Sequence, residues 1–427
     1  MFDRLWIHKY LMIKPLLISS SDINGGAARA AYRLHRGLQS INVSSQMLVQ
    51  NKESDDYTVI APASKLSKGI GKLKPTLDAL PLQLYPQRDR SVYSVQYLPD
   101  QLAAKVAQIN PDVINLHWIN FGYLQIETLA KFKKPIIWTL HDMWAFTGGC
   151  HYNGDCMNYV NSCGACPQLH SNTEKDLSRW VWRRKSKAWQ DLNLTIVTPS
   201  HWLADCARKS SLFQNLRVEV IANGLDAQVY KPIDQAIARN LLNLSLDKKL
   251  VLFGAMNSTR NKRKGFHLLE PALQKLSEDE KLENVELVIL GASRPSEVPN
   301  LGFPIHYLGR LNDDIALALL YSAVDVFLAP SVQDNLPNAV MESLACGTPC
   351  VAFDIGGMSD MIQHQQNGYL AKPFDVNDLA KGITWVLEDE ERLKKLGSNS
   401  RDKVEQKFTL EIQANNYLSV YNYIYKT

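Results

Sequence analysis

Residues 15–26 read PLLISSSDINGG, and a helix-like run follows from Ala27 to Leu38. The apolar stretch predicts a buried strand, the polar residues a loop, and Gly25 and Gly26 a tight turn where the helix begins. This β-loop-α order is the unit from which α/β domains with parallel sheets are built. Free N–H groups at such a helix start favour an anion, although a plain tight turn fits the glycines equally well.

The same alternation repeats along both halves of the chain. Strands are expected at Val113–Leu116, Ile136–Leu140, Thr195–Thr198, Leu250–Gly254, Val285–Gly291, Ile305–Leu308, Val324–Ala329 and Pro349–Phe353. Continuous apolar strands between helices predict parallel sheets covered on both faces. The 427 residues exceed one ordinary domain. We therefore predict two Rossmann-like domains, residues 1–230 and 231–407, with a cleft between them and ligands at the carboxyl ends of the strands.

The terminal segments and the composition limit the cellular context. An aromatic-rich helix is expected over residues 408–427, and the sequence leaves it free to pack on either domain, the N-terminal one included. The net charge of +4 is too small to predict an overall positive field that would attract nucleic acid. The chain contains no apolar run of about 20 residues, so no membrane span is expected. Charged residues near the start argue against a signal peptide. We expect a cytoplasmic protein, with peripheral binding to the inner face of the membrane as a further option.

A cationic segment, residues 260–265, directly follows the first strand of the second half. It reads RNKRKG and holds four cations in its first five residues. The segment lies where an α/β fold places ligand contacts, and a diphosphate needs such charge for its binding and departure. A solvated charged surface is the alternative interpretation. Residues 61–99 are also basic, and their prolines predict a mobile surface excursion carrying Lys65, Lys68, Lys72 and Lys74.

Carboxylates and histidines stand at other strand ends. Asp334 lies in a loop and Glu342 one to two turns into a helix that Pro337 would begin. Two carboxylates near one helix start can accept hydrogen bonds from sugar hydroxyls, but they also suit capping and ion pairing. His141 follows a strand and can donate to a substrate oxygen. His117 competes for that role, and a structural role suits a lone histidine too.

Several segments together resemble one family of enzymes. They are the strand-Gly-Gly-helix opening, Thr139–Asp142, Val220–Asp226, Arg263–Gly265, Leu308–Arg310 and Glu342–Pro349. In order and spacing they are similar to the retaining glycosyltransferases of family 4, over the chain from about residue 15 onward. The resemblance implies a GT-B fold, a nucleotide-sugar donor and no cofactor or metal at the reaction centre.

The resemblance also implies roles for individual residues. Glu342 matches the second glutamate of a Glu-x7-Glu pair and would bind the ribose, whereas Asp334 stands at the first position, where its shorter side chain puts the sugar contact in doubt. Lys264 matches a lysine on the diphosphate, and the accompanying arginine is Arg260 or Arg263. His141 would contact the donor hexose. The whole implied donor-binding set is Gly25, Gly26, Arg260, Arg263, Lys264, Gly309, Arg310, Asn335, Leu336, Asn338 and Glu342.

Four cysteines form an insertion outside this pattern. Cys150, Cys156, Cys163 and Cys166 have the spacing C-x5-C-x6-C-x2-C, and the last two resemble a zinc knuckle. Four thiols this close suit a closed, structural tetrahedral Zn²⁺ site. Four separate loop thiols, or disulfides in an oxidising compartment, are the alternatives.

A basic, tryptophan-rich stretch, Arg179–Trp189, is typical of a membrane interface. An amphipathic helix with its tryptophans packed inward is the stronger interpretation.

From the family resemblance we expect a retaining hexosyltransferase of bacterial polysaccharide or glycoconjugate synthesis with a glycan acceptor, free or lipid-linked, and no nucleic-acid partner. The alternatives are another GT-B sugar enzyme, such as a nucleotide-sugar epimerase, and a non-catalytic two-domain sugar-binding protein. Neutral sugar binding alone would not need the cations near Lys264.

Overall fold

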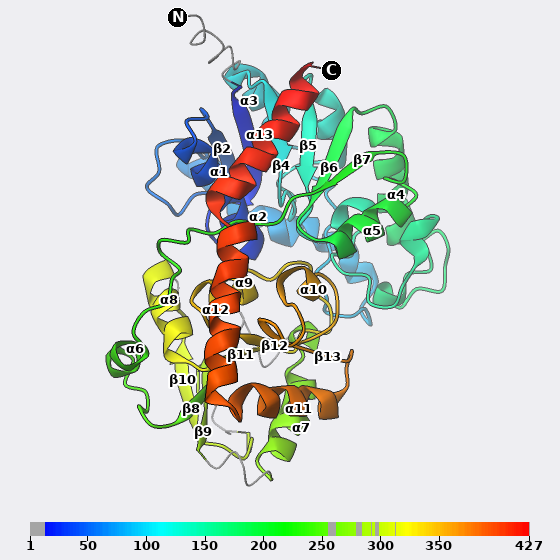
Figure 1. Cartoon of the computed structure of the whole chain (residues 1–427). Helices are drawn as coiled ribbons and strands as arrows, with labels where there is room; N and C mark the ends of the chain where they lie inside the picture. The colour runs from blue at the N-terminus through cyan, green and yellow to red at the C-terminus, as the bar shows by residue number, and fades with distance from the viewer. Residues whose placement is uncertain are drawn as a thin grey trace, which may run out of the picture. The chain divides into compact units, whose positions relative to one another are not determined.

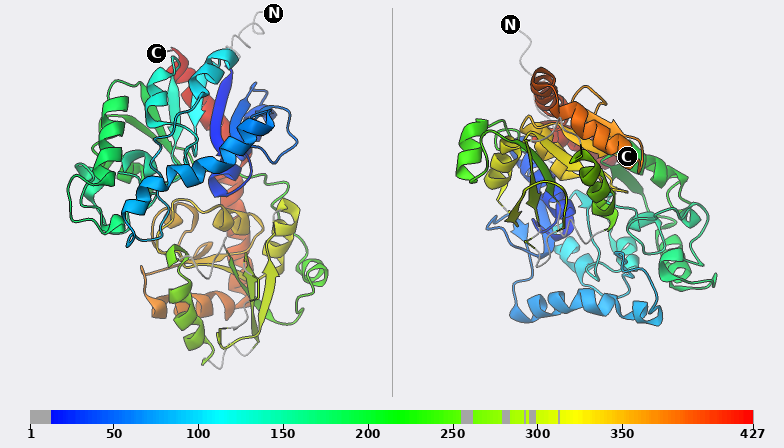
Figure 2. Two further views of the ribbon diagram at one scale, coloured as in Figure 1. Left: turned by 180° about the vertical axis from the view of Figure 1, so that it is seen from behind. Right: turned by 90° about the horizontal axis from the view of Figure 1, so that it is seen from below.

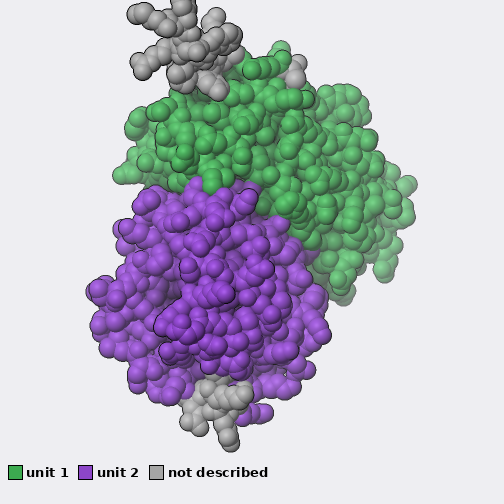
Figure 3. Space-filling model, viewed as in Figure 1, with its two compact units in different colours: residues 1–221, 410–427 green, residues 222–409 purple. Residues whose placement is uncertain are grey.

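The computed structural model describes residues 13–254, 262–278, 284–291, 293–294, 299–311 and 313–426 (Figure 1). These residues form two compact units (Figure 3). Unit 1 comprises Met1–Ile221 and Leu410–Thr427, and unit 2 comprises Ala222–Thr409. The chain therefore leaves unit 1, builds unit 2 and returns to unit 1 for its last helix. No helix within the described ranges is long and apolar enough to cross a membrane.

Unit 1 contains a seven-stranded sheet in the order β3-β2-β1-β4-β5-β6-β7, with every neighbouring pair parallel. Its strands are β1 Pro15–Ser21, β2 Gln46–Asn51, β3 Val59–Ile60, β4 Val113–Leu116, β5 Ile136–Thr139, β6 Leu194–Thr198 and β7 Arg217–Val220. Its α-helices are α1 Gly26–Ser40, α2 Lys65–Asp78, α3 Leu102–Ile109, α4 Leu177–Trp189, α5 His201–Lys209 and α13 Leu410–Lys426. Short 3₁₀ helices are η1 Leu80–Leu84, η2 Ile126–Lys131, η3 Trp144–Phe146, η4 Asn158–Val160 and η5 Pro167–Leu169.

The central strands of unit 1 are largely apolar because both faces of the sheet are covered. On β1, Leu16 and Ile18 enter one buried cluster and Leu17 enters the other, on the opposite face. Helices α1 and α13 cover the face of Leu17. The last helix is fixed there by Asn115 Nδ2, which donates to Tyr421 Oη at 2.8 Å. Position Gly37 lets α13 approach α1, since a Cβ there would lie 2.9 Å from the carbonyl oxygen of Leu410.

Unit 2 contains a six-stranded parallel sheet in the order β10-β9-β8-β11-β12-β13. Its strands are β8 Lys249–Gly254, β9 Val285–Leu290, β10 Ile305–Gly309, β11 Val326–Ala329, β12 Cys350–Phe353 and β13 Gly368–Ala371. Its helices are α6 Gln235–Leu241, η6 Lys262–Lys264, α7 Phe266–Leu276, α8 Asp314–Ala323, α9 Asn338–Ala345, α10 Met358–Met361, α11 Val376–Leu387 and α12 Glu390–Lys407. On β11, Phe327 enters one buried cluster while Val326 and Leu328 enter the other.

Each strand expected from the sequence forms within two residues of its expected bounds. Two other expectations need correction or comment. Residues 61–99 are not only a surface excursion, because α2 forms there and is capped by Ser64, whose Oγ accepts from Ser67 N at 3.1 Å. The tryptophans of α4 divide between two environments, since Trp189 is buried and Trp182 half-buried, whereas Trp180 is exposed.

Candidate functional site

The carboxyl edge of the unit 2 sheet brings together the loops that follow β8 and β11. Gly265 makes this approach possible. Its φ is 74°, and a Cβ there would lie 1.7 Å from the carbonyl oxygen of Pro330. The two loops are then joined by Val332 N, which donates to the carbonyl oxygen of Arg263 at 2.9 Å. A side chain at position 265 would separate the loops, so the glycine fixes the cations of η6 beside the β11 loop.

A compact charge cluster results from this contact. Lys264 Nζ lies 2.6 Å from Asp334 Oδ2, and Arg263 Nη1 lies 3.2 Å from the same oxygen. Ser331 Oγ also donates to this oxygen, at 3.2 Å. Asp334 is buried, and burial opposes its charge, but Lys264 and Arg263 outweigh that effect and hold the pKa of Asp334 well below its usual range. Burial lowers the pKa of Lys264, which Asp334 counteracts.

Helix α9 places Glu342 on its second turn. The residue is only 4% exposed, and Tyr321 Oη donates to its Oε2 at 3.3 Å. Asn335 and Leu336, in the loop before the helix, are also buried. Asn338, the first helical residue, accepts at Oδ1 from Asn223 Nδ2 at 3.3 Å. The loop and first turns of α9 therefore present polar groups whose positions are fixed by packing.

The rest of the expected donor set in unit 2 is more dispersed. Gly309 ends β10 with a φ of 62°, and Arg310 after it is exposed. Strands β10 and β8 are separated by β9 in the sheet. Arg260 lies outside the described residues. Arg263, the other candidate arginine, also donates from Nη1 to the carbonyl oxygen of Gln333 at 2.8 Å.

In unit 1, the carboxyl edge of the sheet carries a stacked pair of histidines. His117 follows β4 and His141 lies two residues beyond the end of β5, with ring centroids 5.3 Å apart and planes 23° apart. His117 Nδ1 and His141 Nε2 are separated by 3.0 Å. Burial lowers the pKa of His141 to about 4, against the opposing effect of Asp142. Burial also lowers the pKa of His117, so both rings are neutral near pH 7.

The Asp142 carboxylate organises the loop around these histidines. Its Oδ2 accepts from Trp118 Nε1 at 2.8 Å and lies 2.6 Å from His151 Nδ1. Its Oδ1 accepts from Trp144 N at 2.9 Å. Neither His151 nor Trp118 stands out in the sequence. Because His151 lies next to Cys150, it ties the cysteine-rich insertion directly to Asp142.

The Gly25–Gly26 turn begins α1. Gly25 has a φ of 97°, and a Cβ added there meets no atom within 4 Å, so the backbone borders open space. Helix α1 has no side-chain cap and no acidic residue in its first turn. The loop before it is held by buried Asp22, whose Oδ2 accepts from Ser54 N at 2.9 Å. This helix start remains suited to an anion.

The structure does not support the zinc prediction. Among the residues that are described, no group of three or more His, Cys, Asp or Glu side chains is arranged to hold a metal ion. All of the cysteines are free, and Cys150, Cys163 and Cys166 are buried in the apolar cluster of unit 1. Burial raises the pKa of Cys163 to about 12. Cys150, Cys163 and Cys166 thus contribute to the packing of unit 1, whereas Cys156 is half-buried.

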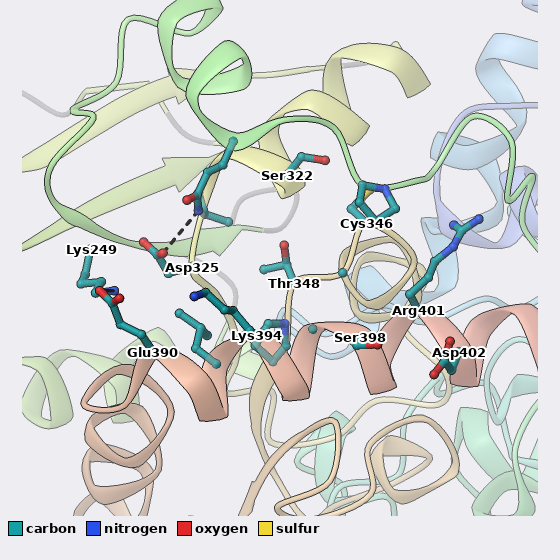
Figure 4. A pocket seen from close by; sticks show the side chains of 17 residues that line it. Lys249, Ser322, Asp325, Cys346, Thr348, Glu390, Lys394, Ser398, Arg401 and Asp402 are labelled. Atoms are coloured by element: carbon teal, nitrogen blue, oxygen red, sulfur yellow. Dashed lines mark hydrogen bonds and ion pairs between the residues drawn. The ribbon is translucent and has the colours of Figure 1, made fainter.

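A cavity of about 570 Å³ lies at the other edge of the unit 2 sheet (Figure 4). It is lined by residues at the beginning of β8 and just before β11, such as Lys249 and Asp325, and by α12 residues such as Lys394 and Arg401. Its polar side chains are largely engaged with one another; for example, Asp325 Oδ1 accepts from Gln235 Nε2 at 3.3 Å. Ligands of open parallel sheets bind at the carboxyl ends of strands, so this cavity is not the expected donor site.

Solved structures share this architecture. The Anabaena protein HepE, crystallised with UDP and glucose, is 18% identical and superposes with a TM-score of 0.63 over 96% of this chain and 99% of that chain. The fold is therefore of the GT-B class. A model described as glycosyltransferase family 4 matches residues 24–229, and one described as glycosyl transferases group 1 matches residues 234–403. The chain belongs to the family 4 glycosyltransferases.

Curated relatives agree with this assignment. An uncharacterized glycosyltransferase of Methanocaldococcus jannaschii is 26% identical over 71% of this chain and 81% of its own length. The N,N'-diacetylbacillosaminyl-diphospho-undecaprenol alpha-1,3-N-acetylgalactosaminyltransferase of Campylobacter jejuni is 28% identical over 52% of this chain and 58% of its own length. Other relatives are matched over 45% to 64% of their length.

Proposed function

We propose that the protein transfers a hexose from a nucleoside-diphosphate sugar to a glycan acceptor, free or lipid-linked, with retention of configuration. The observation that carries this proposal is the charge cluster of Lys264, Arg263 and Asp334 at the carboxyl edge of the unit 2 sheet. Two cations share one carboxylate there, which leaves net positive charge for a diphosphate. A role in bacterial polysaccharide or glycoconjugate synthesis follows, since the Campylobacter relative is named for a diphospho-undecaprenol acceptor.

In this mechanism the bond between the sugar and the diphosphate breaks while an acceptor hydroxyl forms the new glycosidic bond on the same face. The hydroxyl proton passes to the departing diphosphate. Lys264 and Arg263 stabilise the charge that grows on the diphosphate, which is the largest contribution available without a metal. Glu342 holds the ribose hydroxyls, and Asp334, once donor occupies the cations, is positioned by Ser331 near the sugar.

Unit 1 contributes His141 and the start of α1 to the proposed reaction. The neutral imidazole of His141 can donate to a hydroxyl of the donor hexose, because its lowered pKa keeps it uncharged near pH 7. The start of α1 at Gly25 and Gly26 suits an anionic group of the substrate, because the helix dipole favours negative charge there. Gly309, Arg310, Asn335, Leu336 and Asn338 complete the proposed donor contacts.

A thermal-shift screen tests the donor. We expect nucleoside diphosphates and one nucleotide sugar to raise the melting temperature, while free hexoses do not, because a ligand that binds only the folded state stabilises it by mass action. Stabilisation by free sugar with no effect of nucleotides would favour the sugar-binding alternative. Release of an epimerised nucleotide sugar without an acceptor would favour the epimerase alternative.

Product analysis then tests retention and metal independence. Proton NMR of the first transferred residue is expected to reveal the same anomeric configuration as the donor. The reaction is expected to proceed in EDTA, since the cations of the chain replace a metal on the diphosphate. An inverted product would refute the retaining mechanism, and loss of activity in EDTA would refute the metal-free one.

A further inference from the structure

Helix α2 carries an apolar row that faces solvent. At 3.6 residues per turn, the four aliphatic members of this row fall within about 60° of one another around the helix. They are Leu66, Ile70, Leu73 and Leu77, with exposed fractions of 75%, 49%, 61% and 40%. Single exposed apolar side chains are ordinary, but a contiguous row marks an interaction surface. Leu80 and Leu84 of the following η1 extend the exposed apolar surface.

The helix packs on unit 1 through a different face. Gly71 and Asp78 are its buried residues, and they lie roughly a third of a turn from the apolar row. A Cβ at Gly71 would lie 2.7 Å from the side-chain nitrogen of Gln50. Asp78 accepts from the backbone N–H groups of Val95 and Gln96 at 3.0 and 2.7 Å. These contacts orient the helix, so the outward direction of the apolar row is set by the fold.

Lysines flank the apolar row on both sides. Lys65 and Lys72 lie on one side of the row, Lys68 lies further round the helix, and all three are exposed. Lys74, on the other side, is half-buried, with its Nζ 3.5 Å from the carbonyl oxygen of Tyr123. The acidic residue of the helix, Asp78, is buried, so the exposed face combines aliphatic side chains with positive charge alone. Figure 2, in its right-hand view, shows this helix in blue along the edge of the ribbon.

We propose that α2 docks unit 1 on an anionic lipid bilayer. Its apolar row would enter the boundary between headgroups and acyl chains, and its lysines would meet lipid phosphates. A second copy of this chain fits the surface less well, because a symmetric contact between two such helices would place lysines against lysines. The proposal does not depend on the transfer reaction, although it would bring the protein to the surface where lipid-linked acceptors reside.

Sedimentation of the full-length chain with vesicles tests the proposal. One set of vesicles is phosphatidylcholine, and the other contains phosphatidylglycerol as well. One triple variant replaces the row (L66Q/I70Q/L73Q), and another replaces the charge (K65Q/K68Q/K72Q). The matched control, I237Q/L241Q/L246Q, alters exposed aliphatic residues of unit 2 with exposed fractions of 56%, 66% and 55%.

We expect the wild-type protein and the control to partition onto the anionic vesicles. We expect the partition coefficient of each α2 variant to be at least tenfold lower. One lysine at an anionic surface contributes roughly fivefold to partitioning. The melting temperature of both α2 variants should match that of the wild type, because the replaced side chains are exposed. Equal sedimentation of wild type and α2 variants, absence of binding to anionic vesicles, or light scattering that reveals self-association abolished by the row variant would each overturn the proposal.

Discussion

The shared oxygen of Asp334 links residues 263 and 264 to a loop about 70 positions further along the chain. In the family pattern this position holds a glutamate, and the shorter aspartate here reaches the cations closely. We infer that Asp334 serves as a counter-ion that keeps Lys264 and Arg263 in place until a diphosphate replaces it. The carboxylate would then be released toward the sugar.

Replacing Lys264 by Ala should lower kcat more than it raises KM for the donor. The charge on the diphosphate grows as the glycosidic bond breaks, so the lysine stabilises the transition state more than the ground state. Steady-state kinetics with varied donor would measure the two parameters. Lys262→Ala, on the same short helix, is the matched control and should leave both near wild type. A change in KM alone would contradict the proposed role of Lys264.

The Glu342→Ala variant should bind nucleotide and nucleotide sugar much more weakly while staying folded. The carboxylate would accept hydrogen bonds from two ribose hydroxyls, and hydrogen bonds to a charged group contribute roughly 1.5–3 kcal/mol each. Calorimetric titration measures the affinity, and a thermal melt confirms the fold. Unchanged affinity would remove Glu342 from the donor site.

The histidine pair should make stability depend on acidity. In the folded protein burial lowers the pKa of His141 to about 4 and also lowers that of His117. Between about pH 6.5 and 4 the unfolded chain therefore binds more protons than the folded protein does. The folded state loses stability as the pH falls through that window. The melting temperature of His117→Gln should depend less on pH there than that of the wild type. The exposed His267→Gln should keep the wild-type slope, and an unchanged slope in His117→Gln would contradict the prediction.

At the scale of elements, the sequence predicted most of the two sheets because buried strands of parallel sheets are continuously apolar. It did not reveal β3, β7 or β13, which are short and lie at sheet edges, nor β2, an internal strand with polar residues at both ends. The position of Lys264 and His141 at strand ends was predictable from the β/α alternation. The pairing of Lys264 with Asp334 and of His151 with Asp142 was not predictable. Each pair joins two segments that meet only through the folded conformation of the loops.

Helices α2 and α4 show that composition does not fix the direction of a helix face. The basic, tryptophan-rich sequence of α4 is typical of a membrane interface but favours inward packing, and in the structure Trp189 is buried and Lys185 Nζ is buried over the ring of Trp144, at 3.5 Å from its centroid. Helix α2, with glycines and a proline, reads as irregular surface but displays the aliphatic row. Composition alone cannot distinguish these cases, because the direction of a helix face depends on what the rest of the unit offers it.

Helix α13 should contribute measurably to the stability of unit 1. Replacing Tyr421 by Phe removes the acceptor for Asn115 Nδ2 and leaves a buried donor without its partner. We expect the free energy of unfolding, measured in urea, to fall by about 1–3 kcal/mol. Tyr425→Phe on the same helix, where the side chain is 40% exposed, is the control. Equal stability of the two variants would mean that the buried contact contributes little.

At the scale of the whole molecule, a net charge of only +4 conceals a strongly uneven distribution. Positive charge gathers at the cation cluster of unit 2 and along α2 in unit 1. Each concentration suits a different anionic partner, a diphosphate in the first case and lipid phosphate in the second. Salt should therefore weaken vesicle binding, through the exposed lysines of α2, more than donor binding through the buried pair of Lys264 and Asp334.

The return of the chain to unit 1 has a consequence for biosynthesis. Segment Leu410–Lys426 is translated after all of unit 2, yet it covers the sheet face that holds Leu17 and Ile137. On the ribosome, the first unit must wait with the α13 part of that face uncovered while the second is made, although α1 already covers the rest. Unit 2, which is continuous in sequence, can fold as soon as it emerges. A nascent chain arrested before Leu410 should consequently be a client for chaperones through its first half, even though that half was synthesised earliest.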